Sequence, residues 1–376
     1  MIAELITTAR QAADAAMASE FDAQQCLSAR DDMDLFGLRA MARVLRDALP
    51  EGAMLDADQI ADRLCAAPRH RWLLRRWLTE LTEHGWLDHA ADGYRSLRER
   101  STPIRGDLAQ VCADLGFSPE LARFFERANR QLPQLLADRT LAQELLFPNG
   151  DFLTAEAAYR DNPVNRYLNA AAREITAWAV RQLAGERNTV AILELGAGVG
   201  GTTADVVAAL EDSPVDYHFT DLSNFFLTAA RDRFAAYPWM RYSIVDLNTD
   251  LPQQPRYDIV LAANVLHNAH HSARTLRQLR DLLNPGGFLI FIESCREHCQ
   301  LLTSMHFLMS ARPGANLPGR TDVRAETDRI FLREHEWVDQ LTTADLPPLL
   351  VLPDPHHPLA VHGQRVFAAR RPATEP

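Results

Sequence analysis

The sequence predicts two domains: a mainly helical N-terminal domain, and a C-terminal α/β domain built on a doubly wound, mostly parallel sheet. The chain has 376 residues, whereas single hydrophobic cores stop growing at about 250 to 300 residues. Its first hundred residues have the apolar spacing of helices and few internal prolines or glycines. After Asn188 strand and helix patterns alternate, which is typical of a doubly wound sheet.

The helical domain, expected over residues 1–100, has the element order of a winged helix. Two helices are predicted over 55–64 and 71–81, followed by a hairpin over 85–95 with an Asp-Gly turn. One interpretation is a DNA-binding module whose arginines face phosphates. The other, favoured by the acidic chain, is a packing and dimerisation module with a buried apolar face and solvated arginines. The arginines are Arg69, Arg71, Arg75 and Arg76, and the apolar face is Trp72, Leu73, Trp77, Leu78 and Leu81.

Composition narrows the classes of partner. A formal net charge of −11 argues against general nucleic-acid binding, because phosphate contacts supply most of that affinity. No apolar run approaches the roughly 20 residues of a membrane helix, and no secretory signal is visible, so we expect a cytoplasmic protein without membrane association. Small molecules, or substrates held on a carrier protein, are the expected partners.

Five cysteines, an odd number, favour reduced thiols over a disulfide framework. Cys295, His298 and Cys299 lie close together, but no second ligand pair follows at zinc-finger spacing. The sequence therefore predicts no metal site.

Residues 101–187 are predicted to form a helical linker that becomes a lid over a ligand. The segment is interrupted by the turn signals 147–151 and 162–163. Its last helix carries Tyr167, Asn169 and Arg173, which either reach the ligand or fix the lid.

The α/β domain is expected over residues 188–376. Its helices are predicted to begin near Thr202, Asn224 and Ala273. The predicted strands are Val190–Leu195, Asp216–Thr220, Arg241–Val245, Asp258–Ala262, Phe288–Ile292, Leu349–Leu352 and Gln364–Ala369.

A glycine motif follows the first of these strands. The segment 196–201 reads Gly-Ala-Gly-Val-Gly-Gly, and Gly196, Gly198 and Gly201 satisfy the Rossmann fingerprint, in which glycines let the backbone approach a ligand closely. Glu194 precedes the motif. Asp221 ends the next strand, 25 positions after Gly196, near the roughly 20-residue spacing at which a carboxylate meets ribose hydroxyls. These features suit NAD or S-adenosylmethionine.

Further polar residues follow the third and fourth strands and favour S-adenosylmethionine. Asp246 ends the third strand, where its carboxylate can accept the adenine amino group. Asn264 and His267 follow the fourth strand. The motifs Leu-Glu-Leu-Gly-Ala-Gly-Val-Gly-Gly-Thr-Thr, Phe-Thr-Asp-Leu-Ser, Asn-Val-Leu-His and Leu-Asn-Pro-Gly-Gly resemble those of class I methyltransferases.

More narrowly, residues 147–370 resemble the C-methyltransferase domains of polyketide and nonribosomal peptide synthases. The resemblance implies S-adenosylmethionine as the cofactor and C-methylation of an activated natural-product intermediate. The cofactor-binding residues it implies are Tyr167, Glu194, Gly196, Ala197, Gly198, Asp221, Leu222, Asp246, Leu247 and Asn264.

The same resemblance implies a catalytic pair, His267 and Glu293, at the ends of neighbouring strands. A histidine titrates near neutral pH, and a carboxylate partner orients it and stabilises its protonated form. His267 is therefore expected to remove a proton from an activated carbon. The structural alternative is that His267 caps its strand and Glu293 pairs elsewhere.

Two other functions remain open. Small-molecule O-methyltransferases also have an N-terminal winged-helix dimerisation domain, a Leu-His at this position and a later Glu. They continue with Asp and Trp, whereas this chain continues with Asn268 and Ala269, and C-methylating domains more often have Ala-Thr there. The third possibility is a ligand-sensing, DNA-binding regulator without turnover.

The segment 304–319 is expected to cover the acceptor pocket. Apolar side chains from this segment and from a later helix are candidates to line it, although core packing is the commoner role of such residues. An arginine here would meet a carboxylate or a phosphopantetheine phosphate, unless it is simply solvated. The candidates are Met305, Phe307, Met309, Arg312 and Trp337.

Overall fold

The chain folds into two compact units, each built from separated stretches of sequence. The computed structural model describes residues 2–17, 22–148, 154, 162–249, 251, 256–311 and 316–373. One unit, called here the sheet unit, comprises residues 1–21, 159–296 and 331–376. The other, the helical unit, comprises residues 22–158 and 297–330.

This division differs from the consecutive stretches 1–100, 101–187 and 188–376 expected from the sequence. The first helix, α1 (Ile2–Ala15), buries Leu5, Ala9 and Ala13 in the core of the sheet unit, together with the long helix α10 (Pro163–Leu183). After the central strands the chain returns to the helical unit, where α14 (Cys299–Leu302) packs on helices near the N-terminus. The two units are therefore defined by packing between buried side chains that are far apart in the sequence.

The helical unit contains the predicted helix, helix and hairpin. These are α3 (Ala57–Arg63), α4 (Arg71–Glu83), and strands β1 (Asp88–Ala90) and β2 (Gly93–Arg95), which pair antiparallel. Asp56 caps α3 through a capping box with Gln59. The remaining elements are α2 (Ala23–Ala48), η1 (Pro68–His70), α5 (Leu108–Asp114), α6 (Pro119–Arg130), α7 (Leu132–Leu136), α8 (Ala142–Leu146) and η4 (Met305–Met309).

The arginines of α4 and of the turn before it were expected to be solvated. They are instead paired with carboxylates of the same unit. Arg69 contacts Asp138, and Arg75 contacts Asp328, both at 2.6 Å. Arg76, only 7% exposed, lies between two glutamates. The predicted apolar face is buried: Trp72, Leu73, Trp77, Leu78 and Leu81. These arginines pair with the protein's own acids, which reduces their availability for phosphates.

The sheet unit is built on seven strands in the order β5-β4-β3-β6-β7-β9-β8. Neighbours from β5 to β7 are parallel, and β9 runs antiparallel to both β7 and β8. The strands, all close to their predicted positions, are β3 (Val190–Leu195), β4 (Val215–Asp221), β5 (Met240–Ile244), β6 (Tyr257–Ala263), β7 (Leu283–Ser294), β8 (Pro348–Leu352) and β9 (Gln364–Arg370).

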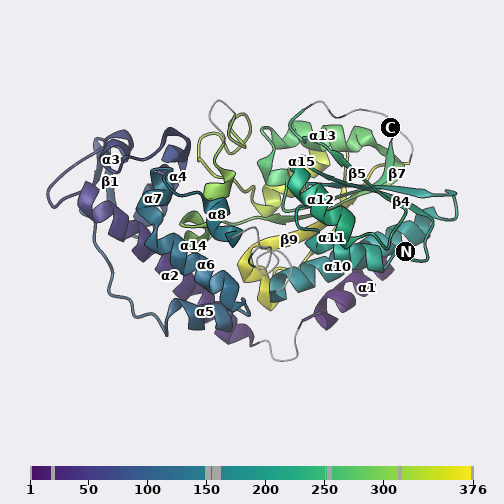
Figure 1. Ribbon diagram of the computed structural model, residues 1–376, viewed down its shortest axis with the longest axis horizontal. Helices are drawn as coiled ribbons and strands as arrows, with labels where there is room; N and C mark the ends of the chain where they lie inside the picture. Colours follow the sequence, from purple (N-terminus) through teal and green to yellow (C-terminus); the bar gives the residue numbers. More distant parts are fainter. Residues whose placement is uncertain are drawn as a thin grey trace. The chain divides into compact units, whose positions relative to one another are not determined.

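Helices cover both faces of this sheet (Figure 1). Alternate residues of β3 serve the two faces: Ile192 belongs to the core beneath α10, and Leu193 to the opposite core. The helices α1, α10, α11 (Gly201–Ala208) and α12 (Asn224–Arg233) pack on the first face, and α13 (Ser272–Leu282) and α15 (Glu334–Thr343) on the second. The short helices η3 (Leu266–Asn268) and η5 (Pro358–His362) complete the unit.

Among the described residues, no helix combines the length and the apolar character needed to cross a membrane. None of the five cysteines, all of which lie in the described part of the chain, forms a disulfide bond.

Candidate active site

The carboxyl ends of β3, β4, β6 and β7 carry most of the residues singled out by the sequence. The strands are paired in register up to these ends, since Leu195 is opposite Ala262, and Ala263 is opposite Ile292. The segments that follow the strands therefore emerge at the same edge. Ligands of open α/β sheets bind at this edge.

The loop between β3 and α11 is shaped by three glycines with positive φ. A Cβ on Gly196 would lie 2.3 Å from Val265, and one on Gly200 would lie 2.9 Å from the Phe234 ring. Gly198 differs: φ is +56°, but a Cβ there would meet only the Gly196 carbonyl oxygen, at 3.9 Å. Packing thus requires glycine at 196 and 200. Gly198 faces open space, where the lack of a side chain leaves the backbone open to the approach of a ligand.

Asp221, the last residue of β4, holds this loop. One of its carboxylate oxygens accepts the Gly198 N–H at 2.9 Å, and the other accepts the Ser223 N–H at 2.8 Å. Burial raises the pKa of Asp221 above its usual value, and the backbone hydrogen bonds oppose that shift. The aspartate therefore lies against the glycine that faces open space; its contact with ribose hydroxyls stays a prediction.

Glu194 lies beneath the loop rather than in it. It is 1% exposed, and its Oε2 accepts hydrogen bonds from Thr203 Oγ1 at 2.8 Å and from the Tyr217 hydroxyl at 2.7 Å. Burial raises the pKa of Glu194 to about 7. Its side chain connects β3, α11 and β4, which suits a supporting role for the loop.

The turn after β5 is organised by Asp246 and Asn248. Asp246 Oδ1 accepts the Asn248 N–H at 2.8 Å, and the Asn248 side chain accepts the His270 N–H and donates to the carbonyl oxygen of Asn268. Asp246 is thus linked to the segment after β6. Leu247 is 6% exposed and belongs to a core cluster.

Three exposed apolar side chains lie at or beside the ends of β4 and β5. Leu222 is 61% exposed, Ile244 53% and Phe225 50%. Solvated apolar side chains beside Asp221 and Asp246 suit a flat, partly apolar ligand such as an adenine ring. Sequence reasoning included Leu222 but missed Ile244 and Phe225, which look like ordinary strand and helix residues in the sequence.

His267 and Glu293 meet as predicted. His267 Nδ1 lies 2.8 Å from Glu293 Oε2, and the His267 backbone N–H donates to Oε1 at 3.1 Å. Both are buried, with Glu293 at 0% exposure, and the Phe331 ring packs edge-on against the imidazole. A carboxylate accepts the Nδ1 proton, so Nε2 is the acceptor nitrogen of the neutral ring.

Asn264 and Tyr167 complete the predicted set. Asn264 follows β6 with φ +53°, and its backbone N–H donates to the Ile292 carbonyl. The Tyr167 ring contacts His357, and its buried hydroxyl has no hydrogen-bond partner in the described part of the chain. Asn169, two residues later, accepts a hydrogen bond from Thr202 in the first turn of α11.

The predicted acceptor-pocket residues do not form one pocket within either unit. Trp337 is 1% exposed in the core of the sheet unit, against Phe291 and Phe367. Met305, Phe307 and Met309 lie in η4 of the helical unit. Arg312 falls outside the described residues.

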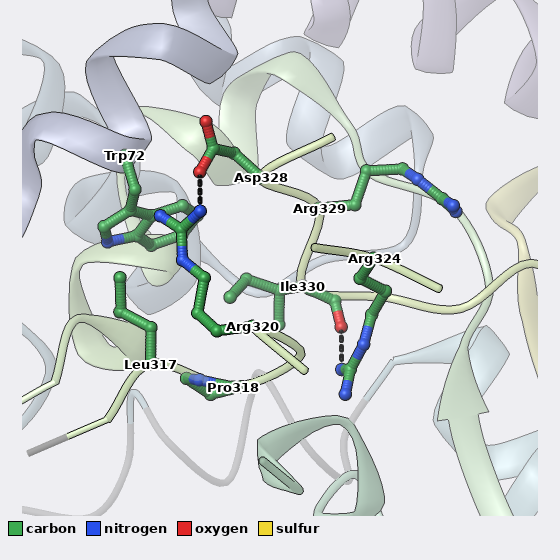
Figure 2. A pocket seen from close by; sticks show the side chains of 8 residues that line it. All are labelled: Trp72, Leu317, Pro318, Arg320, Arg324, Asp328, Arg329 and Ile330. Carbon is green, nitrogen blue, oxygen red and sulfur yellow. Dashed lines mark hydrogen bonds and ion pairs between the residues drawn. The ribbon is translucent and has the colours of Figure 1, made fainter. Parts of the chain in front are cut away.

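The helical unit has a small pocket lined by eight residues (Figure 2). Arg320 points toward Asp328, which it contacts at 2.5 Å, and Arg324 donates to the Ile330 carbonyl at 2.6 Å. Arg324 also pairs with Asp322. Because carboxylates of the same unit already pair with these two arginines, we assign no ligand to this pocket.

A segment of the sheet unit matches a known protein family. Residues 193–289 match the profile of a family described as a methyltransferase domain. The pyochelin synthetase PchF of Pseudomonas aeruginosa is 32% identical over 300 residues, covering 76% of this chain and 16% of that protein. This chain thus spans about a sixth of the length of that relative.

Two solved structures have a similar fold. The CurJ carbon methyltransferase has a TM-score of 0.86 and 23% identity, covering 99% of each chain. The trans-methyltransferase CalH in complex with SAH has a TM-score of 0.60 and 21% identity, covering 93% of this chain and 90% of that one.

Proposed function

We propose that this chain, an S-adenosylmethionine-dependent methyltransferase, methylates an activated carbon of a polyketide or nonribosomal peptide intermediate. The observation that carries the proposal is the buried contact of His267 with Glu293 at the edge that also carries the glycine loop. That contact supplies a base beside a cofactor site, as proton removal from carbon requires.

The cofactor supplies an electrophilic methyl group on a sulfonium centre. The open space at Gly198 lets an amino acid or ribose portion approach the backbone, and Asp221 offers carboxylate oxygens for ribose hydroxyls. Asp246 and the exposed Leu222 would hold and cover the adenine. Tyr167, Ala197, Leu247 and Asn264 remain predicted contacts, whereas Glu194 acts through the loop that it supports.

His267 would take the proton of the acceptor carbon on Nε2. Glu293 fixes the tautomer, because its carboxylate accepts the Nδ1 proton, and it stabilises the imidazolium that forms. Burial of the pair strengthens this attraction relative to water. Loss of this proton would leave a carbanion, delocalised as an enolate, as the nucleophile for the methyl group; the bond between methyl carbon and sulfur would break as the new carbon–carbon bond forms, and S-adenosylhomocysteine would leave.

An acceptor with an acidic carbon fits these relatives. PchF is a synthetase, and the CurJ structure is of a carbon methyltransferase. A carbon between a ketone and a thioester is acidic enough for a histidine to remove its proton. We therefore propose a β-ketoacyl thioester, carried on the phosphopantetheine arm of a carrier protein.

The test supplies the full chain with S-adenosylmethionine whose methyl carbon is carbon-13. A β-ketoacyl thioester, free as the N-acetylcysteamine derivative or loaded on a carrier protein, is compared with a catechol. The expected product carries the label on carbon, which carbon NMR distinguishes from a methyl ether. Methylation of the catechol alone would overturn the proposal and establish O-methylation.

Cofactor binding is measured separately by calorimetry, with NAD as the control ligand. Saturable binding of S-adenosylmethionine alone is expected. The matched variants are His267→Ala, which should bind cofactor but turn over roughly 100-fold more slowly or worse, and Asn188→Leu, an exposed change before β3 that should bind and turn over as wild type does. Normal turnover by His267→Ala would remove the base from the mechanism.

A further inference from the structure

Asn268, directly after His267 in η3, contacts the atom that the proposed mechanism uses. Its Nδ2 lies 3.2 Å from His267 Nε2. Because Nδ1 of the same ring faces Glu293, Nε2 is the acceptor and the Asn268 amide is the donor. The amide and the base therefore meet at the position where the acceptor carbon would deliver its proton.

The backbone of Asn268 is fixed on both sides. Its N–H donates to the Val265 carbonyl at 3.0 Å, and its carbonyl oxygen accepts from Asn248 Nδ2 at 3.1 Å. Asn248 is in turn held by Asp246. The Asn268 side chain is half-buried, whereas His267 is 5% exposed. The backbone of Asn268 is thus held by the turn after β5, and its side chain stays partly accessible.

We propose that Asn268 binds the acceptor, donating a hydrogen bond to its carbonyl oxygen as that oxygen becomes an enolate. The inference rests on the proposed function and adds a second acceptor-facing group to the same site.

The chemistry of enolate formation places the oxygen where this amide can reach it. The C–H bond of the acceptor carbon breaks, its proton goes to His267 Nε2, and the electron pair moves into the carbonyl, leaving negative charge on oxygen. That oxygen lies two bonds, or roughly 2.4 Å, from the carbon that is losing its proton. When the carbon lies at Nε2, this oxygen therefore comes within reach of Nδ2, which lies 3.2 Å from Nε2.

A change of hydrogen-bond partner by the Asn268 amide, from His267 Nε2 to the enolate oxygen, stabilises the transition state more than the ground state. In the free protein the amide donates to Nε2 and so occupies the lone pair of that nitrogen. As the proton arrives at Nε2, this nitrogen stops being an acceptor, and the amide is released to the enolate oxygen. A hydrogen bond to a charged oxygen is stronger than one to a neutral nitrogen, so the gain appears as charge develops.

Deuterium exchange at the acceptor carbon tests this step apart from methyl transfer. The full-length protein is incubated in deuterium oxide with a β-ketoacyl N-acetylcysteamine thioester and SAH, and label uptake above the buffer rate is followed by NMR. Asn268→Leu removes the donor at nearly constant volume, and Asn268→Asp replaces it with negative charge. Asn188→Leu, at an exposed position before β3, is the control.

The expected result is enzyme-dependent exchange by wild type and Asn188→Leu, and a loss of roughly 100-fold in Asn268→Leu, as for removal of one oxyanion donor. Asn268→Asp should lose at least as much. Calorimetry should show unchanged S-adenosylmethionine affinity in all of them, which establishes that the variants fold.

Exchange by Asn268→Leu within threefold of wild type would overturn the inference and leave the proposed base intact. Failure of the wild-type protein both to exchange the proton and to methylate the thioester would overturn the proposed function and this inference together. The two failures are thus distinguished by the wild-type protein alone.

Discussion

Replacing Glu194 with glutamine should change how the stability of the protein depends on pH. Burial raises the pKa of this carboxyl from 4.5 to about 7 in the folded chain. Below pH 4.5 both states are protonated and the group contributes nothing. As the pH rises, the unfolded chain loses the proton first, so the free energy of unfolding falls until the folded carboxyl also ionises near pH 7.

The size of this effect follows from the interval between the two pKa values. Each pH unit within it costs about 1.4 kcal/mol, so the full loss is about 3 kcal/mol, and most of it develops between pH 5 and pH 8. Glutamine keeps the shape and an acceptor for Thr203 and Tyr217, which both donate to Glu194. Glu194→Gln should therefore lack this part of the pH dependence.

The assay is urea unfolding of the ligand-free protein at pH 5, 6, 7 and 8, followed by circular dichroism, for wild type and Glu194→Gln. Other titrating groups are common to both proteins, so the difference between the two curves isolates Glu194. The variant should gain on wild type by about 2 to 3 kcal/mol across this range. A difference that stays flat with pH would refute the reasoning, since the carboxyl would then ionise in the folded protein as it does in the unfolded chain.

Three further changes test the cofactor site and the base. His267→Ala should lower turnover by roughly 100-fold or more with little change in cofactor affinity, measured by steady-state rates and calorimetry; equal losses in both would contradict a base role. Asp221→Ala should weaken S-adenosylmethionine binding, because the Gly198 N–H loses its acceptor; unchanged affinity would show that the carboxylate serves the fold alone. Gly198→Ala should weaken binding as well, since its methyl group enters the open space at a strained φ of +56°; full affinity there would place the cofactor elsewhere.

The sheet of the sheet unit was predictable because its signals are local. Strands buried on both faces appear as short apolar runs, and β3 through β7 lie close to their expected positions. The glycine motif and Asp221 were predictable for the same reason, since a fixed spacing connects a strand end, a tight turn and the next strand end. The pairing of His267 with Glu293 came from family resemblance, and the structure confirms that contact.

The division of the chain was not predictable in this way. Leu5, Ala9 and Ala13 form an ordinary amphipathic stripe, and nothing in that stripe tells which core receives it. The arginines of α4 present the same difficulty. Arg75 is paired with Asp328, 253 positions later, and a sequence pattern carries no information on such a partner. The sequence also did not show which way the Glu194 side chain points. Its carboxylate accepts hydrogen bonds from Thr203 and Tyr217 beneath the glycine loop.

Glu194 and Glu293 show how neighbours assign different work to two carboxylates buried in the same unit. Glu194 accepts only neutral hydroxyl donors in its two side-chain contacts, so its charge is poorly compensated and its proton is retained to about pH 7. Glu293 instead accepts from an imidazole and from a backbone N–H. When His267 gains a proton, the pair becomes an ion pair in a dry environment, where attraction between opposite charges is strong. At Glu194 burial costs stability. At Glu293 burial would instead assist His267 in removing the acceptor's proton, because only there does a positive charge form beside the carboxylate.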